Sequence, residues 1–297
     1  FLVARGPEAF KALPMLTIGE ADQERPVFLR MYDLADAYLA RASRPHGRLA
    51  LGYPELDDVI RGLAPGETMT VLGRAAVGKT MFALNLIERM TLDGQIPTLM
   101  FSLEQPGLEV FERVASMTLG WPGREIETRS REDEPGMVQR FLEVSQRWHS
   151  TVIVEQPCSL EQIDKLVEAA RLSDMWLDPL GLVVVDYMGL VGQRRPTSPY
   201  EHMSLVAREL KNLAKRHRVA VLTLCQVGRE AGESGGEPLT LKSARESGVI
   251  EEAADYLLGI WRPELKEGLP KEKREELAGQ FKVRVLKNRH GPAHKTV

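Results

Sequence analysis

The chain has 297 residues, of which 43% are hydrophobic and 27% are charged, and its formal net charge is −3. This composition is ordinary for a soluble globular protein long enough for a sizeable core, and no run of about 18 apolar residues predicts a membrane span. The near-neutral balance excludes nucleic-acid binding by overall charge, so such binding would depend on local basic patches.

Two cysteines, Cys158 and Cys225, lie far apart and have no nearby His at the spacing of metal ligands. Both lie in or beside apolar, strand-like runs, so we predict two buried, inert thiols and no zinc site. This usage fits a reducing compartment, and we expect the protein to be cytoplasmic. The chain begins with Phe1 and carries no charged-then-apolar leader, so we also expect a part of a longer protein without a secretion signal.

The first 48 residues are expected to lie outside the main domain. Residues 1–27 lack clear periodicity and hold three prolines, which predicts an irregular arm. Over residues 28–42 apolar side chains recur at helical spacing, and the sequence at 44–47, Arg-Pro-His-Gly, then breaks the pattern. We therefore predict an amphipathic linker helix and its connector over residues 28–48, which packs either on its own domain or on a partner.

Residues 49–297 are predicted to form one α/β domain, because strand-like and helix-like runs alternate along them. We expect strands near 68–72, 97–101, 151–154, 181–186, 219–224, 255–261 and 281–287. We expect helices near 79–92, 106–119, 134–147, 159–172 and 200–217. Several strand runs are almost continuously apolar, which favours a mainly parallel twisted sheet with helices on both faces. Two long polar stretches, 189–200 and 227–243, are either functional loops or disordered.

A phosphate loop follows the first predicted strand. The pattern GxxxxGK[ST] is matched in full by Gly73, Arg74, Ala75, Ala76, Val77, Gly78, Lys79 and Thr80. Glycines let the backbone wrap a phosphate chain with its N–H groups turned inward, and the next helix adds the positive end of its dipole. Lys79 would reach the β- and γ-phosphates of ATP, and the Thr80 hydroxyl would ligate Mg²⁺. The alternative, a glycine-rich turn with an incidental lysine, would match by chance in about one chain in a hundred of this length.

Three further residues would complete the chemistry of ATP hydrolysis. Asp186 ends an apolar run and is the expected acid that binds Mg²⁺. Glu104 follows the strand at 97–101; if that strand lies beside the phosphate-loop strand, its carboxylate could orient and deprotonate the attacking water. The alternative for Glu104 is a surface residue that caps the next helix. Gln226 closes another apolar run, where its amide could sense the γ-phosphate or simply end the strand.

Together, these segments resemble the C-terminal motor domain of the DnaB family, the ring-shaped replicative DNA helicases with a RecA-like P-loop ATPase core. The resemblance covers roughly residues 49–297. It is carried by the phosphate loop and by residues 52–57, 62–66, 101–106, 186–190, 208–215, 245–248, 250–251, 254–255 and 287–292. The joint pattern is far more specific than any one of these pieces.

The resemblance implies roles for residues around the bound nucleotide. Glu104 would be the catalytic base, Asp186 the acid linked to Mg²⁺ and Gln226 the nucleotide sensor. Lys287 and Arg289 would act in trans, as fingers that reach the ATP of a neighbouring subunit. Such cations stabilise the charge that develops on a transferred phosphoryl group.

The same resemblance implies partners. The subunits would form a homo-hexameric ring around single-stranded DNA, and a primase or a helicase loader could bind this ring. The linker helix at 28–42 would dock on an adjacent subunit. The DNA-facing loop of the central channel would contain Arg245, Glu246 and Gly248.

The basic residues support this interpretation in part. Residues 281–297 hold five cations and no acid, which suits phosphate contact, although a solvated basic edge strand is the alternative. Arg194 and Arg195 lie in the first long polar stretch, and Arg229 and Lys242 lie around the second. These four could follow a nucleic-acid backbone or could be solvated loop charges.

Two departures from the family pattern and two competing functions stay open. The loop after Gln226 lacks an expected Asn, and residues 263–279 are longer and more charged than expected, which predicts an inserted helix. A RadA-like recombination ATPase is one alternative to a helicase motor, and the lack of a zinc-binding Cys cluster disfavours it. An ATP-assembled regulatory scaffold is the other alternative. Glu104 disfavours the scaffold, because assembly alone needs no group that activates water.

Overall fold

The computed structural model describes residues 47–132, 135–174, 176–192, 198–228, 235–240 and 248–293, with Thr296 and isolated positions between 31 and 43. The chain divides into two units, Phe1–Gly47 and Arg48–Val297. In the first unit, the predicted linker helix is represented by helical backbone at Met31, Leu34, Ala35, Tyr38 and Leu39. The predicted arm at 1–27 lies outside the described residues.

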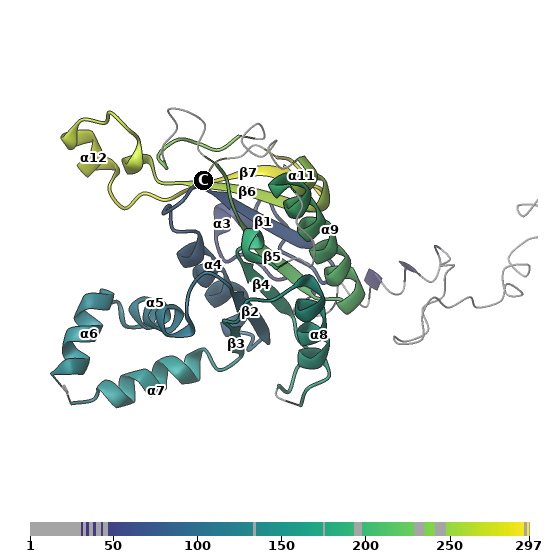
Figure 1. Cartoon of the computed structure of the whole chain (residues 1–297), viewed down its shortest axis with the longest axis horizontal. Helices are drawn as coiled ribbons and strands as arrows, with labels where there is room; N and C mark the ends of the chain where they lie inside the picture. The colour runs from purple at the N-terminus through teal and green to yellow at the C-terminus, as the bar shows by residue number, and fades with distance from the viewer. Residues whose placement is uncertain are drawn as a thin grey trace, which may run out of the picture. The chain divides into compact units, whose positions relative to one another are not determined.

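The second unit is built on a seven-stranded sheet (Figure 1). The strands are β1 (Thr68–Gly73), β2 (Thr98–Ser102), β3 (Thr151–Val154), β4 (Leu182–Asp186), β5 (Ala220–Gln226), β6 (Tyr256–Trp261) and β7 (Lys282–Asn288). Their order across the sheet is β3-β2-β4-β5-β1-β6-β7, and every neighbouring pair is parallel except β6 and β7. The predicted mainly parallel sheet is confirmed, and each predicted strand lies within two residues of the observed bounds.

β2 does not lie beside the phosphate-loop strand, contrary to what the predicted role of Glu104 assumes. β2 pairs with β3 and β4, so β4 and β5 both lie between it and the phosphate-loop strand β1. The condition that this strand lies beside β1 is therefore not met. Strand order along a chain does not determine order in the sheet, because crossover helices can skip positions. Glu104 still follows the carboxyl end of β2, at the same edge of the sheet as the phosphate loop.

Helices cover both faces of the sheet (Figure 1). Apolar side chains of one core cluster come from α4 (Lys79–Ile87), α5 (Gly107–Leu119) and α7 (Met137–Arg147). Those of the second cluster come from α8 (Leu160–Arg171), α9 (Pro199–His217) and α11 (Gly248–Ala253). The central strands β1, β2, β4 and β6 are buried throughout, whereas the edge strands β3 and β7 are partly exposed. Burial on both faces explains why the central strands are continuous apolar runs.

The helices agree less closely with the sequence pattern. The run predicted at 79–92 is α4 followed by a π-helical segment, η2 (Glu88–Leu92). The pattern does not predict several short elements: α3 (Pro54–Asp57), α6 (Gly123–Arg131), η3 (Met188–Leu190), η5 (Pro263–Leu265) and α11. Of these, α6 buries a single residue, Ile126, so no apolar periodicity marks it. The insertion at 263–279 contains α12 (Lys271–Leu277), as predicted.

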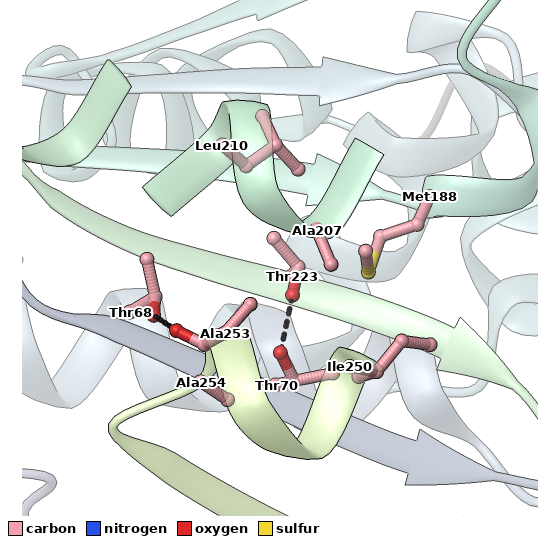
Figure 2. Close-up of a pocket in the computed structure, with 9 residues that line it drawn as sticks. All are labelled: Thr68, Thr70, Met188, Ala207, Leu210, Thr223, Ile250, Ala253 and Ala254. Atoms are coloured by element: carbon pink, nitrogen blue, oxygen red, sulfur yellow. Dashed lines mark hydrogen bonds between the residues drawn. The ribbon is translucent and has the colours of Figure 1, made fainter. Parts of the chain in front are cut away.

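A small cavity lies between the sheet and helices α9 and α11 (Figure 2). Its volume of about 10 Å³ leaves room for at most one water molecule. The hydroxyl groups of Thr70 and Thr223 lie 2.9 Å apart within it and join β1 to β5. The Thr68 hydroxyl donates to the carbonyl of Ala253, which ties the carboxyl end of α11 to the start of β1. The cavity therefore belongs to the core, and its lining holds α11 against the sheet.

Candidate functional site

The phosphate loop, residues 73–80, connects β1 to α4 at the carboxyl edge of the sheet. Its backbone is left-handed at Ala76, with φ 59°, and at Gly78, with φ 98°. A Cβ atom on Gly73 would lie 2.8 Å from Cγ of Lys79 and 2.9 Å from Cγ2 of Val77, which real Cβ atoms essentially never do. Both glycines are therefore required by the path of the loop, as a phosphate cradle at the start of a helix demands.

Both cationic side chains of the loop are buried. Lys79 donates from Nζ to the carbonyl oxygen of Arg74 at 3.0 Å. Burial lowers the pKa of the Lys79 ammonium, while the charges of Glu104 and Asp186 act in the opposite direction. The Arg74 guanidinium donates to the carbonyl oxygen of Glu237 at 2.8 Å. Lys79 thus lies inside the loop near two carboxylates, whereas Arg74 braces the segment at 235–240.

Thr80 and Asp186 meet beside the loop. The Thr80 hydroxyl donates to Oδ2 of Asp186 at 2.6 Å, and Asp186 is only 1% exposed. Its other oxygen, Oδ1, is buried and accepts no hydrogen bond from the described residues. Burial raises the pKa of Asp186, and the Thr80 hydrogen bond opposes this rise. A hydroxyl and a carboxylate oxygen without a partner form a hard oxygen donor set, so these residues fit Mg²⁺.

Glu104 lies at the same edge as Asp186, two residues beyond β2. Ser102, the last residue of β2, pairs with Asp186 in the register of the sheet. Burial has the largest influence on the pKa of both Lys79 and Asp186, lowering the first and raising the second. The charge of Glu104 raises both pKa values, so its carboxylate interacts with both groups. The capping alternative does not hold, because the N–H of Gly107, the first residue of α5, donates to the carboxylate of Glu155 and not to Glu104. Glu104 is exposed, as a group that must meet water requires.

Gln226 is the last residue of β5 and pairs with Gly73, the first residue of the phosphate loop. It is exposed, unlike the six buried residues of β5 that precede it. The next N–H, of Val227, donates to the carbonyl of Gly73 at 3.2 Å. The Gln226 amide therefore lies at the phosphate-loop edge, where its role as a sensor stays a prediction.

The expected finger residues lie at the opposite edge of the sheet. β6 is parallel to β1, so its first residue, Tyr256, lies beside the start of β1. β7 is antiparallel to β6, and its last residue, Asn288, pairs with Tyr256. Lys287 and Arg289 are therefore separated from the phosphate loop by most of the length of β1, about 15 Å. This distance exceeds the reach of either side chain, so neither can serve the phosphate loop of its own chain.

Both finger residues have partners at that edge. Lys287 donates from Nζ to the carbonyl of Glu251 at 2.5 Å, near the carboxyl end of α11. Burial lowers the pKa of Lys287, against the raising charge of Glu251. The Arg289 guanidinium lies 3.3 Å from Oδ1 of Asp255, and its side chain is 59% exposed. Arg289 therefore extends toward solvent from a single long ion-pair contact within the described part of the chain.

Several predicted DNA contacts cannot be placed. Arg194, Arg195, Arg245 and Glu246 lie outside the described residues, as do Arg229 and Lys242. Gly248 is the first residue of α11.

An aromatic pocket beside the phosphate loop is not predicted by the sequence pattern. It has a volume of about 430 Å³, and its lining includes Gly78 of the loop together with Tyr53, Phe82 and Phe281. The rings of Phe82 and Phe281 are stacked with centroids 5.3 Å apart. Asn85 and Arg262 supply polar groups. No local pattern could reveal this pocket, because its walls come from the two ends of the domain and from α4.

The two cysteines are free thiols and are buried, as predicted. Burial raises the pKa of Cys225 to about 12, so this thiol stays protonated. Within the described residues, no helix is both long and apolar enough to cross a membrane.

Residues 49–297 match the family described as "DnaB-like helicase C terminal domain". The chain belongs to this family. The DnaB-like chain is 28% identical over 250 residues to the replicative DNA helicase DnaB of Haemophilus influenzae, covering 81% of the chain and 51% of that relative. It is 26% identical over 216 residues to the DnaB of Treponema pallidum, covering 72% and 48% respectively. It thus spans about half the length of these relatives.

Two solved structures share the fold of this DnaB-like domain. One is described as an ATPase domain, with a TM-score of 0.75 at 22% identity, covering 90% of this chain and 93% of that chain. The other is a DnaB-like replicative helicase described with its primase interactions, with a TM-score of 0.72 at 21% identity, covering 89% and 64% respectively. The RecA-like fold expected from the sequence is therefore confirmed.

Proposed function

We propose that this domain is an ATP-hydrolysing DNA helicase motor that translocates on single-stranded DNA and unwinds duplex during replication. The observation that carries the proposal is the hydrogen bond between Thr80 and Asp186, which joins the phosphate loop to a buried carboxylate. Glu104 and Gln226 follow or end strands at this same edge. Membership of the DnaB-like family supports the proposal. The proposal also includes the activity of the whole protein.

ATP and Mg²⁺ fit the groups of the site. Thr80 and Asp186 would hold Mg²⁺, which when bound supplies positive charge at the β- and γ-phosphates. Lys79 would neutralise the same phosphates once its ammonium turns away from the loop carbonyl. Glu104 would orient the attacking water and accept its proton, and Gln226 would contact the γ-phosphate.

The aromatic pocket suits the purine base of ATP. The stacked rings of Phe82 and Phe281 offer a flat apolar surface next to Gly78 of the phosphate loop. Asn85 and Arg262 are polar groups in the same pocket. Few polar groups on a mainly apolar lining are typical of small-molecule sites, where they orient the ligand.

The catalytic centre would be completed between subunits. Lys287 and Arg289 lie at the edge opposite the phosphate loop, so we assign them to the ATP of a neighbouring copy in a homo-hexameric ring. The linker helix would dock on the same neighbour, as the resemblance to the DnaB family implies. A primase or a helicase loader is proposed as a further partner, and the cytoplasm as the compartment.

The test is the ATPase rate of the chain with and without single-stranded DNA, with unwinding of a forked duplex measured beside it. We expect DNA to stimulate hydrolysis and the fork to open only when ATP and Mg²⁺ are both present. An assembled ring that shows neither stimulation by DNA nor unwinding would contradict the helicase motor. An assembled ring that does not hydrolyse ATP would favour the scaffold.

A further inference from the structure

A polar side chain between the two finger residues holds the turn that carries them. Asn288 ends β7 and lies between Lys287 and Arg289. Its Nδ2 donates to the carbonyl of Val59 at 2.9 Å and to that of Pro292 at 3.1 Å, and its Oδ1 accepts from the N–H of His290 at 3.0 Å. Both Nδ2 partners are carbonyl oxygens and the Oδ1 partner is an N–H, so the orientation of the amide is determined by its surroundings.

These three bonds connect the turn to a distant part of the domain. The bond to Val59 reaches the segment that follows α3, more than two hundred positions earlier in the chain. The bonds to His290 and Pro292 close the turn on itself. The turn is also tightly filled, because a Cβ atom on Gly291 would lie 3.0 Å from Nδ2 of Asn288. The Asn288 side chain therefore ties the turn at 288–292 both to itself and to the segment that follows α3.

The Arg289 side chain is held more loosely than the backbone that carries it. The Arg289 N–H donates to the carbonyl of Asp255 at 2.9 Å, which fixes its backbone. Its guanidinium makes the 3.3 Å contact with Asp255 and is otherwise directed to solvent. Lys287 is anchored through Nζ to the carbonyl of Glu251. A rigid turn with an extended cation is the arrangement that a finger acting on another subunit needs, because catalysis by positioning tolerates little displacement.

We propose that Asn288 is a positioning residue for the fingers Lys287 and Arg289, which it aims at the neighbouring subunit by holding the turn at 288–292. The proposal rests on the trans role assigned to those two residues under the proposed function. Asn288 itself contacts neither ATP nor the reacting atoms. It acts through the backbone on which Arg289 is mounted.

The test compares two Asn288 variants with a matched asparagine. Asn288→Ala removes all three hydrogen bonds. Asn288→Asp keeps the size of the side chain and the acceptor for His290, but it places a carboxylate oxygen against two carbonyls. Asn212→Ala is the control, because Asn212 is exposed on α9 and its side chain bonds only to Glu209 among the described residues.

We expect both Asn288 variants to lower kcat for ATP by about 10- to 100-fold, the cost of a misplaced catalytic group, with the KM for ATP near that of the parent. The Tm should fall by about 5 °C, because the three hydrogen bonds also tie the turn to the rest of the domain. The control should match the parent in every measurement. Mixing Asn288→Ala with Lys79→Ala should restore hydrolysis well above the sum of the two assayed apart. In such mixed assemblies an intact phosphate loop meets an intact finger turn.

The outcomes separate this proposal from the one on which it rests. Normal hydrolysis by Arg289→Ala would contradict the trans role of Arg289, on which the positioning role of Asn288 rests. Loss of hydrolysis in Arg289→Ala with a parental kcat in both Asn288 variants would overturn only the positioning role. Loss of activity in Asn288→Ala that mixing does not restore would also overturn it, because the residue would then support the fold of its own chain.

Discussion

Two buried aspartates, at opposite edges of one sheet, have opposite surroundings. Asp255 directly precedes β6, at the edge of the sheet where the parallel strands begin, here called the amino edge. Its carboxylate accepts from the Thr68 N–H, from Lys211 at 2.5 Å and from Arg289. Asp186 ends β4 at the carboxyl edge, with one oxygen bonded to Thr80 and the other without a partner among the described residues.

The pKa values of these aspartates follow the same division. Burial raises both, but at Asp255 the hydrogen bonds from Lys211 and Thr68 outweigh burial and lower the pKa overall. At Asp186 burial prevails and the pKa is raised. A carboxylate whose oxygens have hydrogen-bond partners stabilises the fold. A buried carboxylate with too few partners costs stability and is suited to bind a cation. The comparison favours the carboxyl edge as the proposed ligand site and gives the amino edge a structural role beneath the predicted finger residues.

The largest effect is expected at the phosphate loop. Lys79→Ala should lower kcat for ATP by about 10³-fold, because it removes the buried cation nearest the transferred phosphate. Steady-state hydrolysis measures this effect. Lys165→Ala, an exposed lysine on α8, is the control and should keep the parental rate. Normal turnover by Lys79→Ala would show that residues 73–80 are not the catalytic phosphate site.

At the amino edge, Asp255→Asn should lower the free energy of unfolding at pH 7 by about 3 kcal/mol, because it leaves the Lys211 ammonium buried without its counter-charge. The folded-state pKa of Asp255 is depressed, so its contribution is present above the unfolded pKa and disappears as pH falls through the folded pKa. Denaturant titrations at pH 7 and at about pH 3 measure this difference.

The control for that titration is Glu127→Gln, whose exposed pair with Arg131 on α6 should contribute less than about 1 kcal/mol. An equal loss in the two variants would mean that the amino-edge network is no more than a surface ion pair. A loss at Asp255 that is independent of pH would contradict the electrostatic origin assigned to it.

The aromatic pocket should contribute affinity rather than rate. Phe281→Ala removes one of the two stacked rings. It should raise the dissociation constant of ATP by about 10-fold, because stacking of one base on one aromatic ring typically contributes about that much affinity. Fluorescent nucleotide titration measures it. Phe141→Ala removes a ring of the Phe111–Phe141 pair and should leave ATP binding unchanged. Unchanged affinity in Phe281→Ala would place the base elsewhere.

The smallest expected effect is a change in Tm caused by replacing Asp186 in the nucleotide-free chain. Its raised pKa means that its charged form costs stability at pH 7, since the folded state favours the protonated carboxyl more than the unfolded chain does. Asp186→Asn should therefore raise the Tm by about 2 °C without nucleotide, and it should abolish the rise in Tm that ATP with Mg²⁺ produces in the parent. A lower Tm in the variant would show that the charge stabilises the fold.

The sequence predicts the phosphate-loop half of the site better than its surroundings. Residues 73–80 are contiguous, and their glycines are required by backbone geometry that any sequence pattern must respect. Asp186 is marked by the fully buried strand before it. The strand order around Glu104 could not be read, because the position of β2 depends on crossovers and long-range packing.

Contacts between distant segments are also invisible in the sequence. Phe281 meets Phe82 across about two thirds of the chain, and Asn288 meets Val59 across more still. Nothing in the local pattern of Lys-Asn-Arg distinguishes the middle residue as a brace from a solvated asparagine. The predicted trans role of Lys287 and Arg289 rests on family resemblance, and the antiparallel direction of β7, which places both residues at the amino edge, supports it independently.

The most direct test of this account mixes Arg289→Ala with Lys79→Ala and measures ATP hydrolysis as a function of their ratio. Each variant alone should assemble but hydrolyse ATP slowly, and the loss of the finger should lower the rate of hydrolysis by about 10³-fold. If each phosphate loop is completed by a neighbour, the mixtures should exceed both pure variants, with a maximum at intermediate ratios. Hydrolysis that falls on the straight line between the two pure variants would contradict a catalytic centre shared between subunits.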